Sequence, residues 1–179
     1  ITTGGGVDTV HLTAVDLNVV ETVDTGDGVD TIFAIQTSLN DTTSDVIDGG
    51  AGTGDTLSIS VTGTVAPFGN NASLAGIENV TFTTDAMVMD LGNQTEALNV
   101  TTANGTNGVT FGGTAANKFT GGTGADTLTL TQAALAAAGT STGGTGANVL
   151  ALNAASTGIV DANFANMSLF QTLTLTGIS

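Results

Sequence analysis

Two tandem nine-residue units constrain the fold of this chain more than any other feature. Residues 112–120 read Gly-Gly-Thr-Ala-Ala-Asn-Lys-Phe-Thr, and residues 121–129 read Gly-Gly-Thr-Gly-Ala-Asp-Thr-Leu-Thr. Both units have Gly at positions one and two, Asn or Asp at position six and an apolar residue at position eight. Glycine permits turn conformations that other residues resist, and alternation of Thr with apolar residues is typical of a strand with one buried face. Each unit therefore predicts a tight turn followed by a short strand.

Related units recur along the chain at unequal intervals. A second pair spans residues 45–57 with one extra residue, and single units lie at 25–32, 143–150 and 4–10. Each unit is too small to bury its own apolar residues, so such repeats stack on one another to form a shared core. The unequal intervals predict coils of unequal length. We therefore expect an all-β fold with irregular coils.

One stretch breaks the strand pattern. Residues 132–138 consist mainly of good helix formers, Thr131 before them can cap a helix, and Gly139 can end it. These features predict one short helix near 132–138. No long linker divides the chain, so we expect residues 1–179 to form a single elongated β-rich unit. Because repeats reach both ends, we also expect this unit to be an excerpt of a longer protein.

The charge of the chain excludes several partners. It has one Lys, no Arg and sixteen acidic residues, for a formal net charge of −15. Such a chain cannot build the cationic surface that binds nucleic acid or an anionic membrane. No apolar run approaches the roughly 20 residues of a membrane-spanning helix. We therefore predict neither nucleic-acid binding nor membrane insertion, and the absence of Cys excludes disulfides and thiolate chemistry.

Nothing in the sequence indicates catalysis. His11 is the only histidine, and no nucleophile or oxyanion pocket is recognisable around it, so we expect a strand histidine that faces water. Paired carboxylates could hydrolyse glycosides, but the chain has no Trp or Tyr to form a sugar platform. Thr-x-Thr runs at 127–131 and 172–176 raise the possibility of ice binding. That function needs a regular Thr array, and the unequal repeat intervals argue against one.

The Gly/Asp turns carry the one recognisable chemistry, which is cation binding. A glycine-rich turn exposes backbone carbonyls, and the Asp at position six adds a carboxylate. Calcium prefers six to eight such oxygens at about 2.3–2.6 Å. One turn supplies half a site and its neighbour supplies the rest. The predicted calcium-site residues are Asp27, Asp30, Asp45, Asp48, Gly50, Gly52, Asp55, Gly113, Asn117, Gly122, Gly124 and Asp126.

We expect one to three calcium ions, bound at the 112–129 tandem and at the turns of 45–55. Asn in place of Asp at Asn117 and Asn148 lowers the negative charge of those two turns. An alternative remains open for all of these residues. Gly/Asp turns are also common where the Asp side chain only accepts hydrogen bonds from nearby backbone amides.

These units resemble a known repeat. Segments 112–129, 45–57 and 25–32 are similar to the RTX nonapeptide repeat of secreted calcium-binding proteins. Together with the related segments 74–83 and 167–176 and a background rich in Thr, Ala, Gly and Asn, they make the chain look like bacterial S-layer proteins and large RTX-type adhesins. The resemblance implies a parallel β-roll or β-solenoid, type I secretion, extracellular display on the cell surface and calcium-dependent assembly.

Two classes of function follow from this interpretation. The first is a structural protein whose copies self-assemble into an extracellular lattice (an S-layer) or a filament. The alternative is a calcium-dependent binding module of an RTX-type adhesin, which engages cell-surface glycans or another cell. A surface rich in Thr and poor in aromatic residues favours broad contact between copies over a ligand pocket. At a net charge of −15 the folded chain repels itself, and calcium bound only by the folded form offsets that repulsion.

Overall fold

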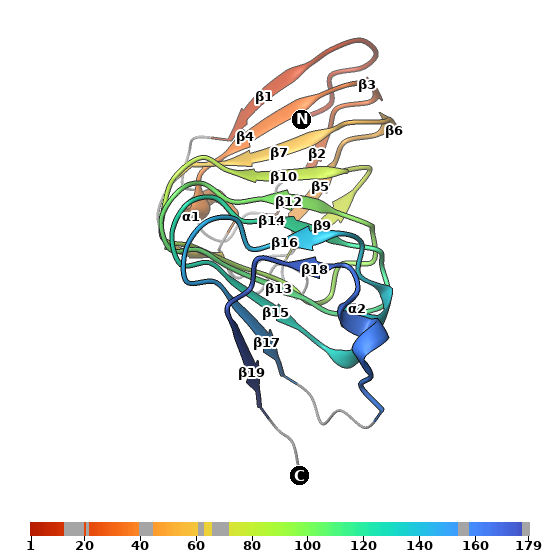
Figure 1. The fold of residues 1–179 in the computed structure, drawn as a ribbon. Helices are drawn as coiled ribbons and strands as arrows, with labels where there is room; N and C mark the ends of the chain where they lie inside the picture. The colour runs from red at the N-terminus through yellow and green to blue at the C-terminus, as the bar shows by residue number, and fades with distance from the viewer. Residues whose placement is uncertain are drawn as a thin grey trace.

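The chain winds into a β-solenoid of about six turns (Figure 1). The computed structural model describes residues 1–12, 20, 22–39, 45–60, 63–65, 72–153 and 158–176. Every pair of strands in this part of the chain is parallel. The expected parallel solenoid is therefore confirmed.

The largest sheet, here called sheet 1, has eight strands. In order they are β1 (Thr9–Leu12), β4 (Thr31–Ala34), β7 (Thr56–Ile59), β10 (Asn79–Phe82), β12 (Asn99–Thr101), β14 (Lys118–Thr120), β16 (Ser141–Thr142) and β18 (Met167–Ser168). Sheet 2 lies below it in Figure 1 and consists of β19 (Thr172–Leu175), β17 (Val149–Leu152), β15 (Thr127–Leu130), β13 (Gly108–Phe111), β11 (Met87–Leu91) and β8 (Gly63–Val65).

The core lies between the sheets, and alternation along each strand builds it. In β15, Leu128 and Leu130 are buried, whereas Thr127 and Thr129 lie on the outer side. Parallel pairing in register places identical positions above one another, so that Leu128 stacks between Val109 and Leu150. Such continuous apolar columns remove one side of every strand from water, which is the main stabilising term for a stack of this kind.

The N-terminal turns contain a further sheet. Sheet 3 consists of β2 (Thr22–Asp24), β5 (Asp45–Asp48) and β9 (Ala72–Ala75), and the short strands β3 (Asp27–Gly28) and β6 (Ala51–Gly52) pair beside it. The described strands of sheet 2 begin with β8, so sheets 1 and 3 form the described part of the N-terminal turns. From β10 onward the described chain passes between sheets 1 and 2 without a further sheet 3 strand.

The coils are irregular, as expected. Hydrogen-bonded positions of successive turns are 22, 25 and 23 residues apart in the N-terminal part, and 19 residues apart at Asn107 and Asp126. The strand registers nevertheless remain aligned, because the additional residues lie in the connections between the strands.

A helix forms where the sequence predicts one, as α2 (Gln132–Ala137), and the Thr131 hydroxyl accepts the Ala134 N–H at 3.1 Å. The sequence did not predict the one-turn helix α1 (Gln36–Leu39) or the 3-10 turn η1 (Asp161–Phe164). Both lie in the connections between strands. No helix in the described ranges has the length and apolarity needed to cross a bilayer.

Candidate metal centre at the glycine corners

Glycines line two corners of the solenoid, where the turns stack too closely for side chains. The first corner comprises the turns that lead into sheet 1, and the second comprises those that lead into sheet 2. At the first corner, Gly26 has φ +83°, and a Cβ there would lie 1.8 Å from the carbonyl oxygen of Gly4. At the second corner, Gly146 has φ +139°, and a Cβ would lie 1.7 Å from the Gly124 oxygen. Glycine at these positions brings backbone carbonyls of neighbouring turns into the corner.

Four acidic side chains form a ladder along the first corner: Asp8, Asp30, Asp55 and Glu78. Asp30 Oδ1 accepts the backbone N–H of Asp8 at 2.7 Å, and Asp55 Oδ1 accepts that of Asp30 at 2.7 Å. Glu78 Oε2 accepts the N–H of Gly54 at 2.8 Å and that of Asp55 at 2.9 Å. Three carboxylates of this acid ladder, those of Asp30, Asp55 and Glu78, therefore hold the turn before them. The position-six side chains lie along the stack and not toward solvent.

The second corner has a ladder of the same geometry but different chemistry, which we call the amide ladder: Asn107, Asp126, Asn148 and Gln171. Asp126 Oδ1 accepts the N–H of Asn107 at 3.0 Å, and Asn148 Oδ1 accepts that of Asp126 at 2.9 Å. Gln171 Oε1 accepts the N–H of Asn148 at 2.7 Å. Three of its four members are neutral amides.

Each Asp of these two ladders has one oxygen left over. The Oδ2 atoms of Asp8, Asp30, Asp55 and Asp126 are buried, and none has a hydrogen-bond partner among the described residues. Asp55 and Asp126 are 0% exposed and Asp30 is 1% exposed. A buried carboxylate oxygen without a partner is costly. Such an atom calls for a proton or a cation.

Asn148 shows what the corner supplies at this point. Its Nδ2 donates to the carbonyl oxygens of Leu169 at 3.2 Å and Gly144 at 3.3 Å. The Leu169 oxygen lies 2.4 Å from the position that a Cβ of Gly143 would take, and the Nδ2 lies 2.9 Å from it. The second atom of position six therefore faces a carbonyl of the following turn, and in Asn148 this atom is a donor.

Asp126 places an oxygen in the equivalent position. The position of a Cβ on Gly121 would lie 2.2 Å from the Gly143 carbonyl oxygen and 2.8 Å from Asp126 Oδ2. In the first corner, a Cβ on Gly52 would likewise lie 1.9 Å from the Gly28 oxygen and 3.2 Å from Asp55 Oδ2. In both corners two hydrogen-bond acceptors, a backbone carbonyl oxygen and a carboxylate oxygen, therefore lie around the same point. A hard divalent cation satisfies both oxygens at once, so these residues fit calcium.

The pKa values of two ladder carboxyls reflect the same conflict. Burial raises the pKa of Asp55 above its ordinary value of 3.8, the Asp30 N–H opposes the rise, and the charges of Glu78 and Asp30 add to it. Burial also raises the pKa of Asp126, and the hydrogen bonds from Asn107 partly oppose the rise. The Gly122 N–H and the Thr102 hydroxyl lie close enough to lower this pKa as well, although neither forms a hydrogen bond with Asp126 Oδ2. Both carboxyls therefore resist ionisation unless a positive charge lies beside them.

The predicted calcium residues occupy four kinds of position. Asp30, Asp55 and Asp126 are ladder members with an unpaired second oxygen, and Gly50, Gly52, Gly113, Gly122 and Gly124 lie in the stacked corners. Asn117 Oδ1 accepts the Leu98 N–H at 2.9 Å, and Asp48 Oδ1 accepts the Gly50 N–H at 2.8 Å. Asp45 is buried at the start of β5, and Asp27 is exposed on β3. Calcium binding by these residues stays a prediction.

Two members of the acid ladder, Asp8 and Glu78, were absent from the predicted set, as were the three amides of the amide ladder. Asp8 follows Gly4-Gly5-Gly6 at the position-six spacing, so the repeat contained the signal for it. Glu78 belongs to a turn with only one glycine, and its role depends on a side chain long enough to reach two N–H groups of the preceding turn. No three His, Cys, Asp or Glu side chains in the described ranges are grouped so that they could hold a metal ion. A site at these corners must therefore draw ligands from backbone carbonyls.

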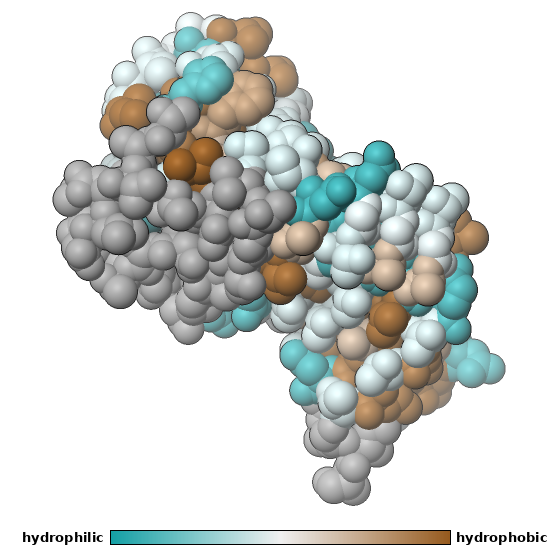
Figure 2. Space-filling view, turned by 90° about the vertical axis from the view of Figure 1, so that its left-hand side faces the viewer, coloured by the Kyte–Doolittle hydropathy of each residue, from teal (hydrophilic) through white to brown (hydrophobic). Residues whose placement is uncertain are grey.

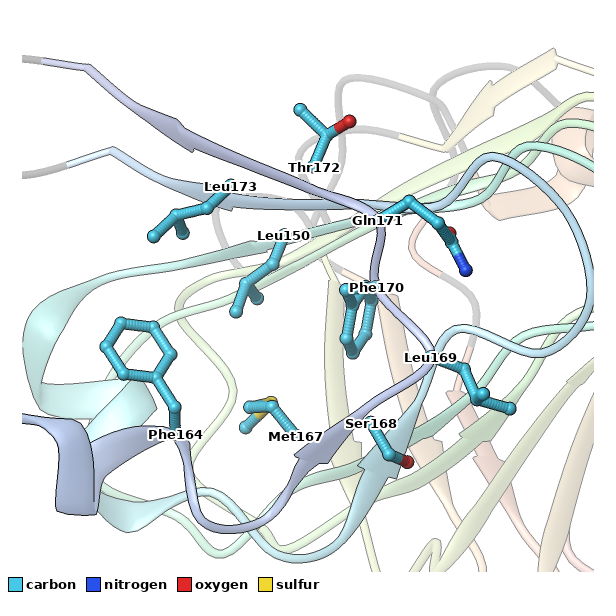
Figure 3. A pocket seen from close by; sticks show the side chains of 9 residues that line it. All are labelled: Leu150, Phe164, Met167, Ser168, Leu169, Phe170, Gln171, Thr172 and Leu173. Atoms are coloured by element: carbon cyan, nitrogen blue, oxygen red, sulfur yellow. The ribbon is translucent and has the colours of Figure 1, made fainter.

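An apolar pocket and the single histidine lie outside the two corners. An apolar pocket of about 290 Å³ lies between η1 and the strands β18 and β19, where Phe164, Met167 and Phe170 converge beside Leu150 (Figure 3). Its lining contains no ionisable side chain, so it offers no acid–base or metal chemistry. His11 is exposed on β1 as predicted, and its ring stacks on Phe33 at 4.8 Å. No protein family, curated protein or solved structure matches this chain.

Proposed function

We propose that this chain is a structural cell-surface protein that self-assembles outside the cell into an S-layer lattice or a filament, and that calcium bound at the glycine corners stabilises it. The observation that carries the proposal of self-assembly is the outer face of sheet 1. This face is free of carboxylates although the whole chain has a net charge of −15.

The outward positions of sheet 1 are almost all uncharged. Along the eight described strands they are Thr9, His11, Thr31, Phe33, Thr56, Ser58, Asn79, Thr81, Asn99, Thr101, Lys118, Thr120, Thr142 and Ser168. The only Lys and the only His of the chain are both on this face. Two copies that approach through sheet 1 therefore avoid the like-charge repulsion that opposes other approaches.

The size of this face suits repeated weak contacts. The eight strands have two to four residues each, which at about 3.3 Å per residue and about 4.8 Å between strands gives a face of about 400 Å² per copy. A pair would bury about 800 Å², which is the size of a weak contact. In a lattice, many such contacts add together. Figure 2 shows the side that lies on the left of Figure 1, where pale, teal and brown residues are interspersed.

In-register Thr also bears on ice binding. Thr81, Thr101, Thr120 and Thr142 form one column across neighbouring strands, so unequal coils do not prevent regular rows. Sheet 2 places Thr127 and Thr129 on one strand, but the next strand has Val149 and Ala151 at those positions. No two neighbouring strands of the described sheets carry Thr at both outward positions. A two-dimensional Thr array is therefore missing from these sheets.

The buried Asp oxygens support the calcium part of the proposal. Calcium at the corners would be held by the Asp Oδ2 atoms and by carbonyls such as those of Gly28 and Gly143, and it would link successive turns as a disulfide does elsewhere. Extracellular calcium can saturate weak sites that cytosolic calcium leaves empty. The chain would then remain loose during export and become ordered outside the cell.

Electron microscopy of the purified protein tests the assembly. We expect ordered sheets or fibres when calcium is added and their loss in chelator. Stable monomers at high protein concentration with calcium present would overturn self-assembly and favour the adhesin module. Circular dichroism tests calcium separately, and β-structure that is unchanged in chelator would refute its structural role.

A further inference from the structure

We infer that the calcium requirement of this chain lies mainly in its N-terminal turns, where Asp8, Asp30, Asp55 and Glu78 stack at one corner, with one further isolated site at Asp126, whereas the Asn-bearing turns carry their own substitute for the cation. The inference rests on the calcium part of the proposed function and goes beyond it. It states which turns need the ion and which do not.

The first step is the continuity of the acid ladder. Four consecutive turns place a carboxylate at the same point of the stack, and the carboxylates of Asp30, Asp55 and Glu78 each accept an N–H of the preceding turn. In three of these turns the second oxygen is buried and has no partner among the described residues. Neighbouring turns of a solenoid lie about 4.8 Å apart. Stacked carboxylates at this spacing repel one another, and a column of divalent cations between them converts the repulsion into attraction.

The second step is the amide substitution. Asn148 Nδ2 donates to the Leu169 and Gly144 oxygens, and Asn107 Nδ2 donates to the Ala103 oxygen and to Asp126 Oδ1, each at 3.0 Å. An amide therefore provides both functions at position six: an acceptor for the preceding turn and a donor for the carbonyls at the corner. Asn therefore donates directly to the carbonyl oxygens beside it, whereas Asp at the same position needs a cation or a proton between its second oxygen and those carbonyls.

The third step is the distribution of the two residue types. Leu98 and Asn117 take the positions of the later turns that correspond to Glu78. The next turn still has an acid nearby, Glu96, but its two oxygens accept the N–H groups of Gly76 and Ile77, so neither oxygen needs a cation. The second corner has a single acid, Asp126, between Asn107 and Asn148. Asn107 donates its amide to that acid, so part of its charge is compensated. The turns from β12 onward therefore contain one isolated cation site and no column.

Hydrogen–deuterium exchange of the full chain tests the inference, in calcium and after calcium removal with chelator. We expect calcium removal to increase exchange at least tenfold in peptides that cover β1, β4 and β7. Peptides that cover β12, β14 and β17 should change by less than threefold. Equal loss of protection in both sets would overturn the partition while calcium dependence stands. No change in either set would overturn the calcium part of the proposed function as well.

Two variants change the calcium dependence of individual turns, so that a general loss of stability in chelator cannot account for the result. Asp30→Asn with Asp55→Asn should give β4 and β7 protection that persists in chelator. Asn148→Asp should make β15 and β17 lose protection in chelator while they stay protected in calcium. If the double variant does not fold, Asn148→Asp still decides, because unchanged protection of β15 and β17 in chelator would overturn the inference.

Discussion

Asn148 Oδ1 accepts the backbone N–H of Asp126 at 2.9 Å, so that the amide of one turn holds the acid of the turn before it. The two residues occupy the same position of the repeat, 22 residues apart. Their second atoms differ: Asn148 Nδ2 is hydrogen-bonded, whereas Asp126 Oδ2 is buried without a partner among the described residues. Asn148 and Asp126 thus differ by one atom: the turn with the amide nitrogen has all its hydrogen bonds, whereas the turn with the second carboxylate oxygen needs a cation or a proton.

Asp126→Asn should stabilise the metal-free protein. The new Nδ2 can donate to the Gly143 oxygen as that of Asn148 does to Leu169, which removes an unsatisfied buried oxygen worth about 1–3 kcal/mol. Urea denaturation in chelator measures the gain. Asp161→Asn, at an exposed carboxylate, is the control and should leave stability unchanged. A loss of stability in chelator for Asp126→Asn would contradict this account of the corner.

Asn148→Ala should destabilise the protein both with and without calcium. It removes the acceptor of the Asp126 N–H and the donor to the Leu169 and Gly144 oxygens, and buried groups left unsatisfied in this way cost about 1–3 kcal/mol each. Thermal unfolding followed by circular dichroism gives the size of the loss. Asn153→Ala, at an exposed position after β17, should have little effect. Equal melting temperatures for the two variants would show that the ladder contributes nothing.

Gly146→Ala should prevent normal stacking of the second corner. Its φ is +139° and its Cβ would lie 1.7 Å from the Gly124 oxygen. Positive φ alone costs about 1–3 kcal/mol, and the clash with a backbone atom adds to that. Gly108→Ala is the matched control, because the nearest atom to its Cβ is a Val88 methyl at 3.5 Å. We expect Gly108→Ala to express as a folded protein, and soluble expression with far-UV circular dichroism compares the two.

Metal-free protein should lose stability as the pH rises above about 4. The folded-state pKa values of Asp55 and Asp126 are raised above their ordinary value of 3.8. The folded chain therefore binds more protons than the unfolded chain between 3.8 and those raised values, and stability falls across that window. Melting temperatures in metal-stripped buffer at a series of pH values measure the effect.

The same measurement on Asp55→Asn with Asp126→Asn provides the control for the pH dependence. This double variant lacks the two raised carboxyls, so its melting temperature should decline less between pH 4 and 7. An identical decline in both proteins would assign the pH dependence to other groups.

A negative charge on the outer face of sheet 1 should block assembly. Thr101→Asp with Thr120→Asp adds two carboxylates to neighbouring exposed positions on β12 and β14. We expect monomers by analytical ultracentrifugation in calcium where the unmodified chain forms large assemblies. Thr174→Asp, exposed on the outer side of β19, adds a charge to sheet 2 and should still assemble. Assembly of the sheet 1 variant at the original protein concentration would exclude this face.

The local elements of this fold could be predicted because their causes are local. Gly at positions one and two and alternation of Thr with Leu indicate the turn and strand of residues 121–129, and the Thr131 cap indicates α2. Asp8 could have joined the predicted ladder on the same grounds, since it has the position-six spacing. The helix α1 and the change from sheet 3 to sheet 2 along the stack could not be predicted, because connections of unequal length carry no repeated pattern.

The sequence by itself determined the glycine corners, the alternating strands and the oxygen-rich chemistry of position six, because each depends on residues a few places apart. Only the tertiary structure decided which of those oxygens are satisfied. The partner of each position-six side chain belongs to another turn, about twenty residues away, and irregular coils hide that correspondence until the strands are aligned. Only after that alignment is it evident that the Asn148 side chain has hydrogen-bond partners for both of its polar atoms, whereas Asp55 has no positive charge beside its second oxygen in the described part of the chain.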